Sequence, residues 1–246
     1  MFPLEKKRAF VTGASRGIGA AIARRMAAEG ADVALGYEKS AAAVSAIVDE
    51  IRAQGRRAVA IQMDAADPES VVRAVDSAAH AFGGLDIIVN NAGIIRGGPI
   101  ESMSLQDVDD TLAVNVRSVI LASQAAIRHM GEGGRIISTG SNLAERVPAE
   151  GTSLYSASKA ALIGWTKGLA RDLGPRGITV NIVHPGSTNT DMNPMDGPRS
   201  AAQLDRMAIK RYGRAEDVAA LVAFVARDEA RSINGTGLTV DGGANA

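Results

Sequence analysis

Between positions 12 and 19 the chain reads Thr12-Gly13-Ala14-Ser15-Arg16-Gly17-Ile18-Gly19, and this stretch decides the fold. An apolar run from Ala9 to Thr12 precedes it, and a pattern with helical spacing, Gly17 to Glu29, follows it. Glycines let the backbone turn tightly against a pyrophosphate, whose charge is then held by free N–H groups at a helix N-terminus. The order of strand, glycine turn and helix therefore predicts a nucleotide-binding turn. Its Gly-x-x-x-Gly-x-Gly spacing departs from the usual Gly-x-Gly-x-x-Gly, and the alternative is a glycine-rich connection without a ligand.

Short apolar runs alternate with longer helical patterns along the rest of the chain. We expect strands at Ala9 to Thr12, Asp32 to Gly36, Ala58 to Met63, Ile87 to Asn90, Arg135 to Ser138, Thr179 to Val183 and Gly237 to Val240. We expect helices at Gly17 to Glu29, Ala41 to Gln54, Pro68 to Phe82, Leu105 to Met130, Ser153 to Leu173 and Ala215 to Ala226. Strands separated by helices require right-handed crossovers, which place the strands in a parallel sheet covered on both faces. The sequence therefore predicts a doubly wound α/β fold with about seven strands.

One irregular segment interrupts this alternation. Pro185 to Pro198 is rich in Pro, Gly, Asn and Thr, and a loop of this length in a compact domain usually has a function. It follows the sixth predicted strand, beyond the carboxyl end where open α/β sheets bind ligands. We therefore expect residues 1–246 to form a single domain with a substrate loop around residues 187–211.

The composition excludes several classes of function. Lys and Arg together number 27, as do Asp and Glu, so the net charge is zero and no basic surface indicates nucleic acid or an anionic membrane. The lack of cysteine excludes disulfides and thiolate catalysis, and it fits a reducing compartment. His80, His129 and His184 show no paired spacing, so we expect no metal site. The charged start, Met1 to Arg8, lacks the apolar core of a signal peptide, and no run reaches transmembrane length, so we expect a cytoplasmic protein.

A second motif, Tyr155-Ser156-Ala157-Ser158-Lys159, lies in the helical segment from Ser153 to Leu173. Residues four apart share one face of a helix, so the phenol and the ammonium are expected to be neighbours. An ammonium beside a phenol favours the phenolate and lowers the phenol pKa from about 10 towards working pH, which suits a proton donor to a carbonyl oxygen. The spacing alone also fits an ordinary half-exposed helix face.

Five motifs in the right order make the chain resemble the short-chain dehydrogenase/reductase family over nearly its whole length. They are the glycine turn, Asn90-Asn91-Ala92-Gly93 after the fourth predicted strand, Asn115 in the next helix, Ser141 after the fifth strand, and Tyr155 with Lys159. Two further motifs, Pro185-Gly186 and Asp241-Gly242-Gly243, also resemble those of the family. The resemblance implies a Rossmann-type fold and hydride transfer between a nicotinamide cofactor and a carbonyl or alcohol, but it does not fix the substrate.

The resemblance implies four catalytic roles. Tyr155 would be the general acid in ketone reduction and the general base in alcohol oxidation, while Lys159 would bind the nicotinamide ribose hydroxyls and lower the Tyr155 pKa. Ser141 would hydrogen-bond the substrate oxygen, so that two fixed hydroxyls stabilise charge as it develops there. Asn115 would interrupt its helix and hold a water that connects Lys159 to solvent. Ser138 is the competing serine, but it still belongs to the predicted strand. Two structural alternatives stay open: Ser141 could be an ordinary turn residue, and the Asn115 side chain could simply bond to the backbone.

Cofactor choice depends on the end of the second strand, where an Asp or Glu would accept bonds from a 2′-hydroxyl and repel a 2′-phosphate. Tyr37 occupies that position without charge, Arg16 in the glycine turn can reach the same phosphate, and Lys39 is close by. The sequence therefore favours NADP(H) over NAD(H). Glu38 is the counter-argument, unless its carboxylate merely pairs with Lys39 or solvent.

The resemblance extends to the remaining cofactor contacts. Asp64 would meet the adenine edge, although a loop-capping aspartate fits the same position, and Thr188 and Thr190 would contact the carboxamide and the pyrophosphate. The expected cofactor-binding residues are Gly13, Ser15, Arg16, Gly17, Ile18, Gly19, Tyr37, Lys39, Asp64, Ala65, Asn91, Ala92, Gly93, Tyr155, Lys159, Pro185, Gly186, Thr188 and Thr190.

The substrate wall is expected to be apolar and adaptable. Its expected residues are Ile94, Asn142, Val147, Leu154, Met192 and Met195. Ser141 lies farther from Tyr155 than in many relatives, so the intervening stretch is expected to form a slightly longer substrate loop. Together these observations predict an NADP(H)-dependent oxidoreductase that reversibly reduces a ketone or aldehyde to an alcohol.

Two other functions on the same scaffold stay open. Reduction of 3-oxoacyl-carrier-protein would need a basic patch for an acidic carrier, and Arg96, Arg128 and Arg146 are too dispersed to decide. The loop from Asn193 to Pro198, followed by Met207 to Arg211, resembles that of a cyclic-di-nucleotide-binding, biofilm-dispersal member of the family. The retained catalytic set argues for catalysis. The resemblance also implies a homotetramer, which alanine-rich long helices would allow by packing closely.

Overall fold

The computed structural model describes residues 2–246 and contains a sheet of seven parallel strands in the order β3-β2-β1-β4-β5-β6-β7. The strands are β1 Arg8–Val11, β2 Asp32–Tyr37, β3 Ala58–Gln62, β4 Ile87–Asn90, β5 Arg135–Thr139, β6 Thr179–Pro185 and β7 Gly237–Val240. The chain moves outwards from β1 to β3, then returns to β4 on the other side of β1, which makes β1 and β4 the switch point of the sheet. The predicted doubly wound fold is confirmed.

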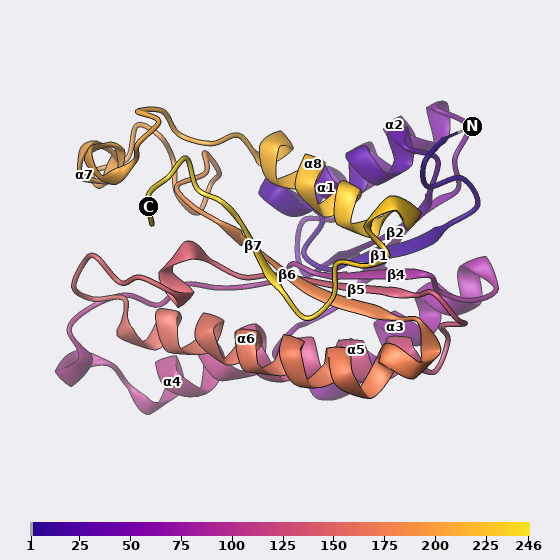
Figure 1. Ribbon diagram of the computed structural model, residues 1–246, viewed down its shortest axis with the longest axis horizontal. Helices are drawn as coiled ribbons and strands as arrows, with labels where there is room; N and C mark the ends of the chain where they lie inside the picture. Colours follow the sequence, from indigo (N-terminus) through magenta and orange to yellow (C-terminus); the bar gives the residue numbers. More distant parts are fainter. Residues whose placement is uncertain (1) are drawn as a thin grey trace.

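Helices cover both faces of this sheet (Figure 1). One face carries α1 (Gly17–Ala28), α2 (Ala41–Ala53) and α8 (Ala215–Ala226), and the other carries α3 (Pro68–Phe82), α5 (Ser118–Ile127) and α6 (Ser153–Leu173). Strands β4, β5 and β6 are buried along their whole length because side chains on both of their faces meet helices. Two large apolar clusters result, one on each face of the sheet, beside a small third one of Val119, Leu162 and Ile182.

One predicted helix is divided in the structure. The segment expected as a single helix, Leu105 to Met130, consists of α4 (Leu105–Leu112), a π-helical stretch (Ala113–Arg117) and α5. The π-helical stretch contains Asn115, whose Oδ1 accepts the N–H of Ile94 and whose Nδ2 donates to the Ile94 carbonyl, both at 2.9 Å. Single π-helical turns inside α-helices often mark functional positions. The expected interruption of the helix at Asn115 is confirmed.

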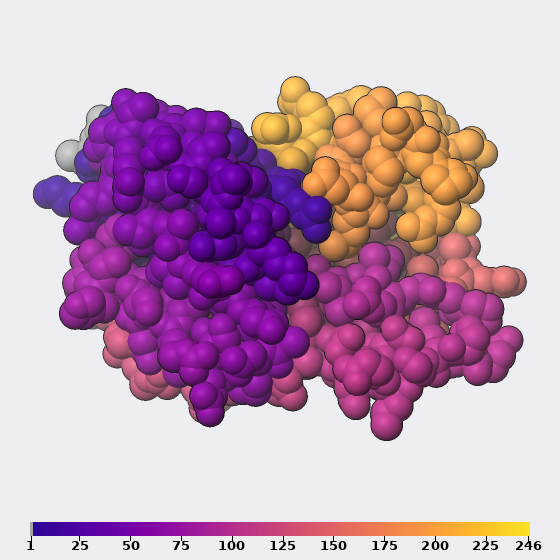
Figure 2. All heavy atoms as spheres, turned by 180° about the vertical axis from the view of Figure 1, so that it is seen from behind, coloured from indigo at the N-terminus to yellow at the C-terminus, as the bar shows by residue number. Residues whose placement is uncertain are grey.

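The segment after β6 lies above the carboxyl ends of the strands. Two isolated bridges, Thr188 with Gly213 and Thr190 with Asn193, organise it, and the short helix α7 (Ser200–Arg206) follows. Helix α7 has no buried residue, so no apolar pattern in the sequence indicates it. Figure 2 shows a hollow between the orange segment that includes α7 and the magenta segment that includes α4.

Four 3₁₀ turns complete the described secondary structure, at Ile100–Ser102, Asn142–Ala144, Gly174–Arg176 and Asp228–Ala230. The helices of residues 2–246 are all too short or too polar to cross a membrane.

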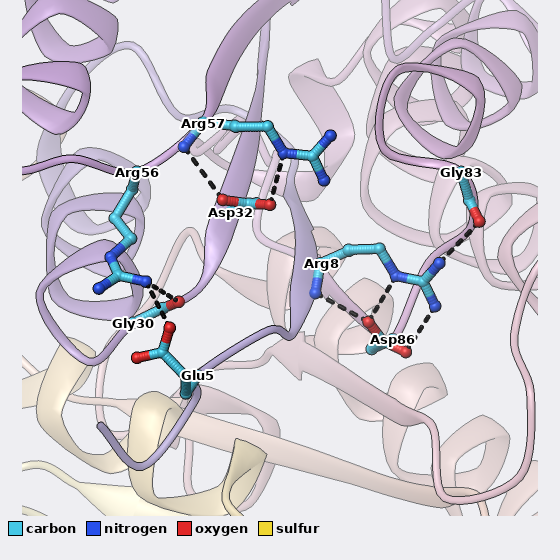
Figure 3. Close-up of polar contacts among 8 residues, drawn as sticks. All are labelled: Glu5, Arg8, Gly30, Asp32, Arg56, Arg57, Gly83 and Asp86. Carbon is cyan, nitrogen blue, oxygen red and sulfur yellow. Dashed lines mark hydrogen bonds and ion pairs between the residues drawn. The ribbon is translucent and has the colours of Figure 1, made fainter. Parts of the chain in front are cut away.

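The opposite edge of the sheet, where the strands begin, is fastened by arginine–carboxylate pairs (Figure 3). Arg8 binds Asp86 through two side-chain contacts, Nε to Oδ2 at 2.7 Å and Nη2 to Oδ1 at 2.8 Å, and its backbone N–H also donates to Oδ2. Arg57 makes a similar contact with Asp32 at 2.7 Å. Since Arg8 begins β1 and Asp86 precedes β4, the first pair joins the two strands at the switch point, with the planar geometry that makes such pairs strong.

Replacing Asp86 by Asn tests this fastening. Burial alone would raise the pKa of Asp86, but hydrogen bonds from the Arg8 side chain and backbone outweigh it and hold that pKa below its ordinary value. Such a carboxyl contributes stability above its unfolded pKa of about 3.9 and loses it as pH falls through the lower folded value. We expect Asp86→Asn to lower the free energy of unfolding by about 1–2 kcal/mol at neutral pH, and by less in acid.

Urea unfolding at neutral and acid pH measures this effect. Asp32→Asn is the matched control, because its arginine partner is more exposed, and it should cost less. Equal midpoints for Asp86→Asn and the unmodified protein at neutral pH would contradict the prediction.

Candidate active site

Hydrogen bonds join the turn after β1 to the turn after β4. The Oγ1 atom of Thr12 accepts the N–H groups of Asn91 at 2.9 Å and Ala92 at 3.0 Å. Asn91 donates from Nδ2 to the carbonyls of Thr12 at 3.0 Å and Gly13 at 3.2 Å. A Cβ atom on Gly13 would lie 2.9 Å from the Ala92 Cα, so only glycine allows this approach. The sequence marks the glycines of the turn, but it gives no sign that the Thr12 hydroxyl is the link.

The glycine turn presents free N–H groups at the start of α1. Gly13 and Gly17 have φ angles of 64° and 54°, which glycine adopts at little cost. The Arg16 side chain makes no capping bond to the helix, and the first turn contains no acidic residue, so the first N–H groups and the helix dipole can hold an anion. Ser15, Ile18 and Gly19 belong to the same turn and first helical residues.

The segment after β6 reaches the same place. A Cβ atom on Gly17 would lie 3.4 Å from Cγ2 of Thr190. Pro185 ends β6, Gly186 donates its N–H to the Val240 carbonyl at 2.9 Å, and Thr188 Oγ1 donates to the Gly186 carbonyl at 3.1 Å. The structure therefore brings these residues to the carboxyl edge of the sheet, beside the glycine turn.

The end of β2 carries no free carboxylate directed at a ligand. Tyr37 ends the strand and is half-buried, and the Glu38 Oε1 atom lies 2.7 Å from the Lys39 Nζ atom. This is the Glu38–Lys39 pairing that the sequence left open. Arg16 Nη1 lies 3.4 Å from Oδ2 of Asp191, and both side chains are exposed. Exposed pairs of this kind are weak, so Arg16 and Lys39 can turn towards a ligand at little cost.

Asp64 caps its own loop. Its Oδ1 accepts the N–H of Ala66 at 2.8 Å, and its backbone N–H donates to Ser70 Oγ at 3.0 Å. This is the loop-capping arrangement, while the adenine contacts of Asp64 and the neighbouring Ala65 stay predictions. A hollow of about 560 Å³ adjoins Asp64 and is bordered by β3 and α3.

Tyr155 and Lys159 extend from one face of α6, as expected. Lys159 Nζ lies 5.9 Å from the centre of the Tyr155 ring. The Lys159 side chain is only 4% exposed, and its Nζ donates to the Thr139 carbonyl at the end of β5 at 2.8 Å. Burial lowers the pKa of Lys159 to about 8. Ser141 follows β5, where its Oγ accepts the N–H of Leu143 at 3.1 Å, so its hydroxyl proton is free to donate elsewhere.

The Tyr155 phenol stays protonated in this geometry. Burial raises the pKa of Tyr155, and a hydrogen bond with the Ser141 side chain opposes this rise without reversing it. The predicted net fall of the Tyr155 pKa below about 10 is therefore wrong here, because desolvation is the largest influence and the Lys159 ammonium donates to Thr139. Ser138, the competing serine, is buried inside β5, which leaves Ser141 as the serine that meets Tyr155.

Asn115 is fully buried and joins three parts of the site. Besides its two bonds to Ile94, its Nδ2 donates to Ser158 Oγ at 3.0 Å, and Ser158 in turn donates to the backbone of α6. A Cβ atom on Gly93 would lie 3.3 Å from Asn115 Oδ1 and 3.4 Å from Lys159 Nζ. The π-helical turn therefore holds the loop after β4 close to the Lys159 ammonium, while the water expected beside Asn115 stays a prediction.

Of the expected wall residues, Ile94 bonds to Asn115, Asn142 follows Ser141 and Leu154 precedes Tyr155, while a pocket role for all six stays a prediction. Ile94, Asn142 and Leu154 are half-buried, and Val147, Met192 and Met195 are exposed by 51–58%.

The C-terminal tail, which no sequence motif places in the site, holds the loop after β5. Asn245 Nδ2 donates to the Asn142 carbonyl at 2.8 Å, and Asn142 Nδ2 donates to Asn245 Oδ1 at 3.3 Å. Arg146 adds a bond to the Ala244 carbonyl at 3.1 Å, and Asp241 accepts the Asn245 N–H at 3.0 Å. Figure 1 shows the C-terminus between α7 and this loop. No local pattern could reveal a contact between residues so far apart in the chain.

Comparisons with known proteins agree with this geometry. A family model described as "Enoyl-(Acyl carrier protein) reductase" matches residues 13–245. The crystal structure of a short chain dehydrogenase from Burkholderia cenocepacia in complex with NADP is 71% identical, with a TM-score of 0.98 and coverage of 99% of this chain and 100% of that chain. The cyclic-di-GMP-binding biofilm dispersal mediator protein of Escherichia coli is 43% identical over 236 residues, 96% of each protein. Versicolorin reductase stcU of Emericella nidulans is 40% identical over 256 residues, 99% of this chain and 97% of that protein.

Proposed function

The chain belongs to the short-chain dehydrogenase/reductase family of oxidoreductases, and on this premise we propose that it reduces a ketone or aldehyde reversibly to an alcohol with NADPH. The observation that carries the proposal is the placement of Tyr155 and Lys159 on one face of α6, with Ser141 at the end of the neighbouring strand β5. A carbonyl oxygen that gains charge needs one proton donor and one further hydrogen-bond donor, and this pair of hydroxyls supplies both.

The residues present fit a dinucleotide cofactor. The glycine turn offers the first N–H groups of α1 to a pyrophosphate. Within residues 2–246, the Lys159 ammonium donates to a single carbonyl, that of Thr139, so it retains protons for ribose hydroxyls. NADPH, when bound, supplies the hydride that reduces the carbonyl carbon. We assign the predicted cofactor-binding residues, from Gly13 to Thr190, to this ligand.

The side chains of this chain then donate the proton and stabilise the charges that form. Tyr155 transfers its phenolic proton to the substrate oxygen, and Ser141 donates a hydrogen bond to the same atom. The raised pKa of Tyr155 keeps the phenol protonated at neutral pH, which favours the direction of reduction. Lys159, with a pKa of about 8, is mostly charged at neutral pH and stabilises the phenolate that remains. Asn115 holds the loop that faces Lys159.

Three features favour NADPH over NADH. Tyr37 provides no charge that would repel a 2′-phosphate, and the Lys39 ammonium lies 2.7 Å from the Glu38 carboxylate, where its positive charge offsets the negative charge of Glu38. Arg16 forms only a weak exposed pair with Asp191, so it is available to the phosphate. A charge-assisted bond of that kind contributes about 1.5–3 kcal/mol where it is partly desolvated.

We further propose that the substrate is apolar, because Val147, Met192 and Met195 expose large apolar side chains and methionine adapts its shape to a ligand. The chain would act as one domain, with residues 187–211 as its substrate loop. Versicolorin reductase stcU, a relative whose name describes a reductase, is compatible with this reading.

The positions of three arginines bear on whether the chain binds an acidic carrier protein. Arg96 lies 3.7 Å from Asp107 and Arg128 lies 3.2 Å from Asp76, so both charges are paired within the chain. Arg146 donates to the C-terminal tail. The three arginines thus contact different parts of the chain, α4, α3 and the C-terminal tail, and this dispersion disfavours 3-oxoacyl-carrier-protein reduction, which would need basic residues in one patch.

A signalling role is the second candidate, because the Escherichia coli relative named as cyclic-di-GMP-binding is 43% identical over nearly the whole chain. This chain keeps Ser141, Tyr155 and Lys159 in the arrangement that proton transfer to a carbonyl requires. A pure binder has no need of a protonated phenol in that place, so we prefer catalysis.

Light scattering tests the proposed homotetramer. Ala161, Gly164 and Gly168 form an exposed, small-residue face of α6 that permits close packing against a second copy. We expect a tetrameric mass at micromolar concentration and a smaller mass for Gly168→Arg. A monomeric mass for the unmodified protein would refute the assembly.

Tyr155→Phe tests the proton donor. We expect turnover of a carbonyl substrate to fall by about a hundredfold or more, because only the acidic hydroxyl is lost. Binding of NADPH, measured by fluorescence titration, is the control and should remain nearly unchanged. Near-normal turnover would exclude Tyr155 as the acid.

Steady-state kinetics with both cofactors test selectivity. We expect kcat/KM to be about tenfold or more higher with NADPH than with NADH, and Arg16→Ala to reduce the NADPH value far more than the NADH value. Tyr37→Asp should reverse the order, because its carboxylate repels the phosphate and accepts from a ribose hydroxyl. Asp191→Asn is the matched control, since it removes the partner of Arg16 and should keep the preference for NADPH. If the unmodified protein prefers NADH and Arg16→Ala lowers both values equally, the assignment fails.

A further inference from the structure

His184 lies in β6, directly before Pro185, and it is completely buried. Its Nδ1 atom lies 2.9 Å from the carbonyl oxygen of Ser141 and 3.3 Å from the Ser141 nitrogen. The shorter contact is with an acceptor, so we assign the ring proton to Nδ1, which then donates to the Ser141 carbonyl. The imidazole is thus bonded to the backbone of the residue whose hydroxyl meets Tyr155.

The neighbouring strands leave a slot for this ring. A Cβ atom on Gly140, at the end of β5, would lie 2.8 Å from the His184 Cε1 atom. A Cβ atom on Gly237, at the start of β7, would lie 2.7 Å from the His184 Nε2 atom. Both distances are shorter than real side chains allow, so the two glycines admit the ring and any larger residue would displace it. The imidazole is held on two sides and cannot move without moving Ser141.

The ring is also electrically neutral. Burial lowers the pKa of His184, against a weaker opposing influence of Glu145 and the Ser141 backbone. Its Nε2 atom has no hydrogen-bond partner among residues 2–246, although leaving a buried polar atom unpaired costs free energy. An apolar residue would avoid that cost, so the presence of an imidazole here indicates that its Nδ1–H bond has a function.

We propose that His184 is a positioning residue, which fixes the backbone of Ser141 and thereby sets the contact between the Ser141 hydroxyl and the Tyr155 phenol. The proposal rests on the proposed function, in which that hydroxyl and phenol both serve the substrate oxygen. His184 touches neither substrate nor cofactor in this scheme. A misplacement of the serine by about 1 Å would be costly for proton transfer, which is why a rigid support has value.

Two substitutions separate this role from plain packing. The amide nitrogen of asparagine falls near the place of Nδ1, and that of glutamine falls near the place of Nε2. His184→Asn should therefore keep the bond to the Ser141 carbonyl, and His184→Gln should lose it. Asn181→Ala is the matched control, because Asn181 is equally buried in β6 but bonds to Ile233 and Thr236 instead.

Titration of the Tyr155 phenol by NMR is the first measurement, and it needs no substrate. The chain has only three tyrosines, so the Tyr155 signal is identified by its loss in Tyr155→Phe. The Ser141 hydrogen bond lowers the Tyr155 pKa, so His184→Gln should raise that pKa, while His184→Asn and Asn181→Ala should leave it in place. An unchanged pKa in His184→Gln, or an equal rise in Asn181→Ala, would overturn the proposal.

Turnover supplies the second measurement. His184→Gln should lower kcat about tenfold, with little change in NADPH binding. His184→Asn should keep most of the kcat of the unmodified protein. In a Ser141→Ala background His184→Gln should have almost no further effect, because the group that it positions is already gone. Equal losses in both backgrounds would overturn the proposal.

Two controls complete the design. The tautomer is read from the unmodified protein by nitrogen NMR, so the proposal stays testable if His184→Gln does not fold, and a proton on Nε2 would overturn it. Failure of the proposed function has a different signature, in which no carbonyl is turned over by any variant while the phenol titration still follows His184.

Discussion

A buried ammonium, that of Lys159, lies where α6 meets the carboxyl end of β5. Removing a charge from water is costly unless hydrogen bonds replace the lost hydration. The Thr139 carbonyl provides one such bond, and the absence of a Cβ atom on Gly93 leaves space beside the cation. Strand, helix and the loop after β4 must all keep their positions to hold this charge. This loss of hydration lowers the pKa of Lys159 to about 8.

The Tyr155 phenol depends on the same desolvation. Burial disfavours the phenolate and the cation alike, so the group nearest the substrate is a neutral acid with a charged neighbour behind it. Ser141 opposes the rise in the Tyr155 pKa, so the position of this serine affects how acidic the phenol is, although burial has the larger influence. The support of Ser141 by His184, and of its loop by Asn245, extends the site well beyond the residues that meet a ligand.

The sequence predicts the strands and most helices closely, since parallel strands are continuous apolar runs and the glycine turn marks the first crossover. Helix α7 has no buried residue, so periodicity could not reveal it. The Tyr155–Lys159 spacing predicts that the two side chains share a helix face, but spacing cannot show that the ammonium turns to Thr139. Thr12, His184 and Asn245 act through contacts with residues far along the chain, and such contacts have no local signature.

Turnover of carbonyl compounds by the unmodified protein tests the central claim most directly. Ketones, aldehydes and acetoacetyl thioesters would be offered with NADPH or NADH, and cofactor oxidation would be followed beside a binding titration with cyclic di-GMP. We predict NADPH-dependent reduction of at least one apolar ketone or aldehyde and only weak binding of the dinucleotide. Tight dinucleotide binding with no turnover of any carbonyl would contradict the assignment of Tyr155 as a working acid.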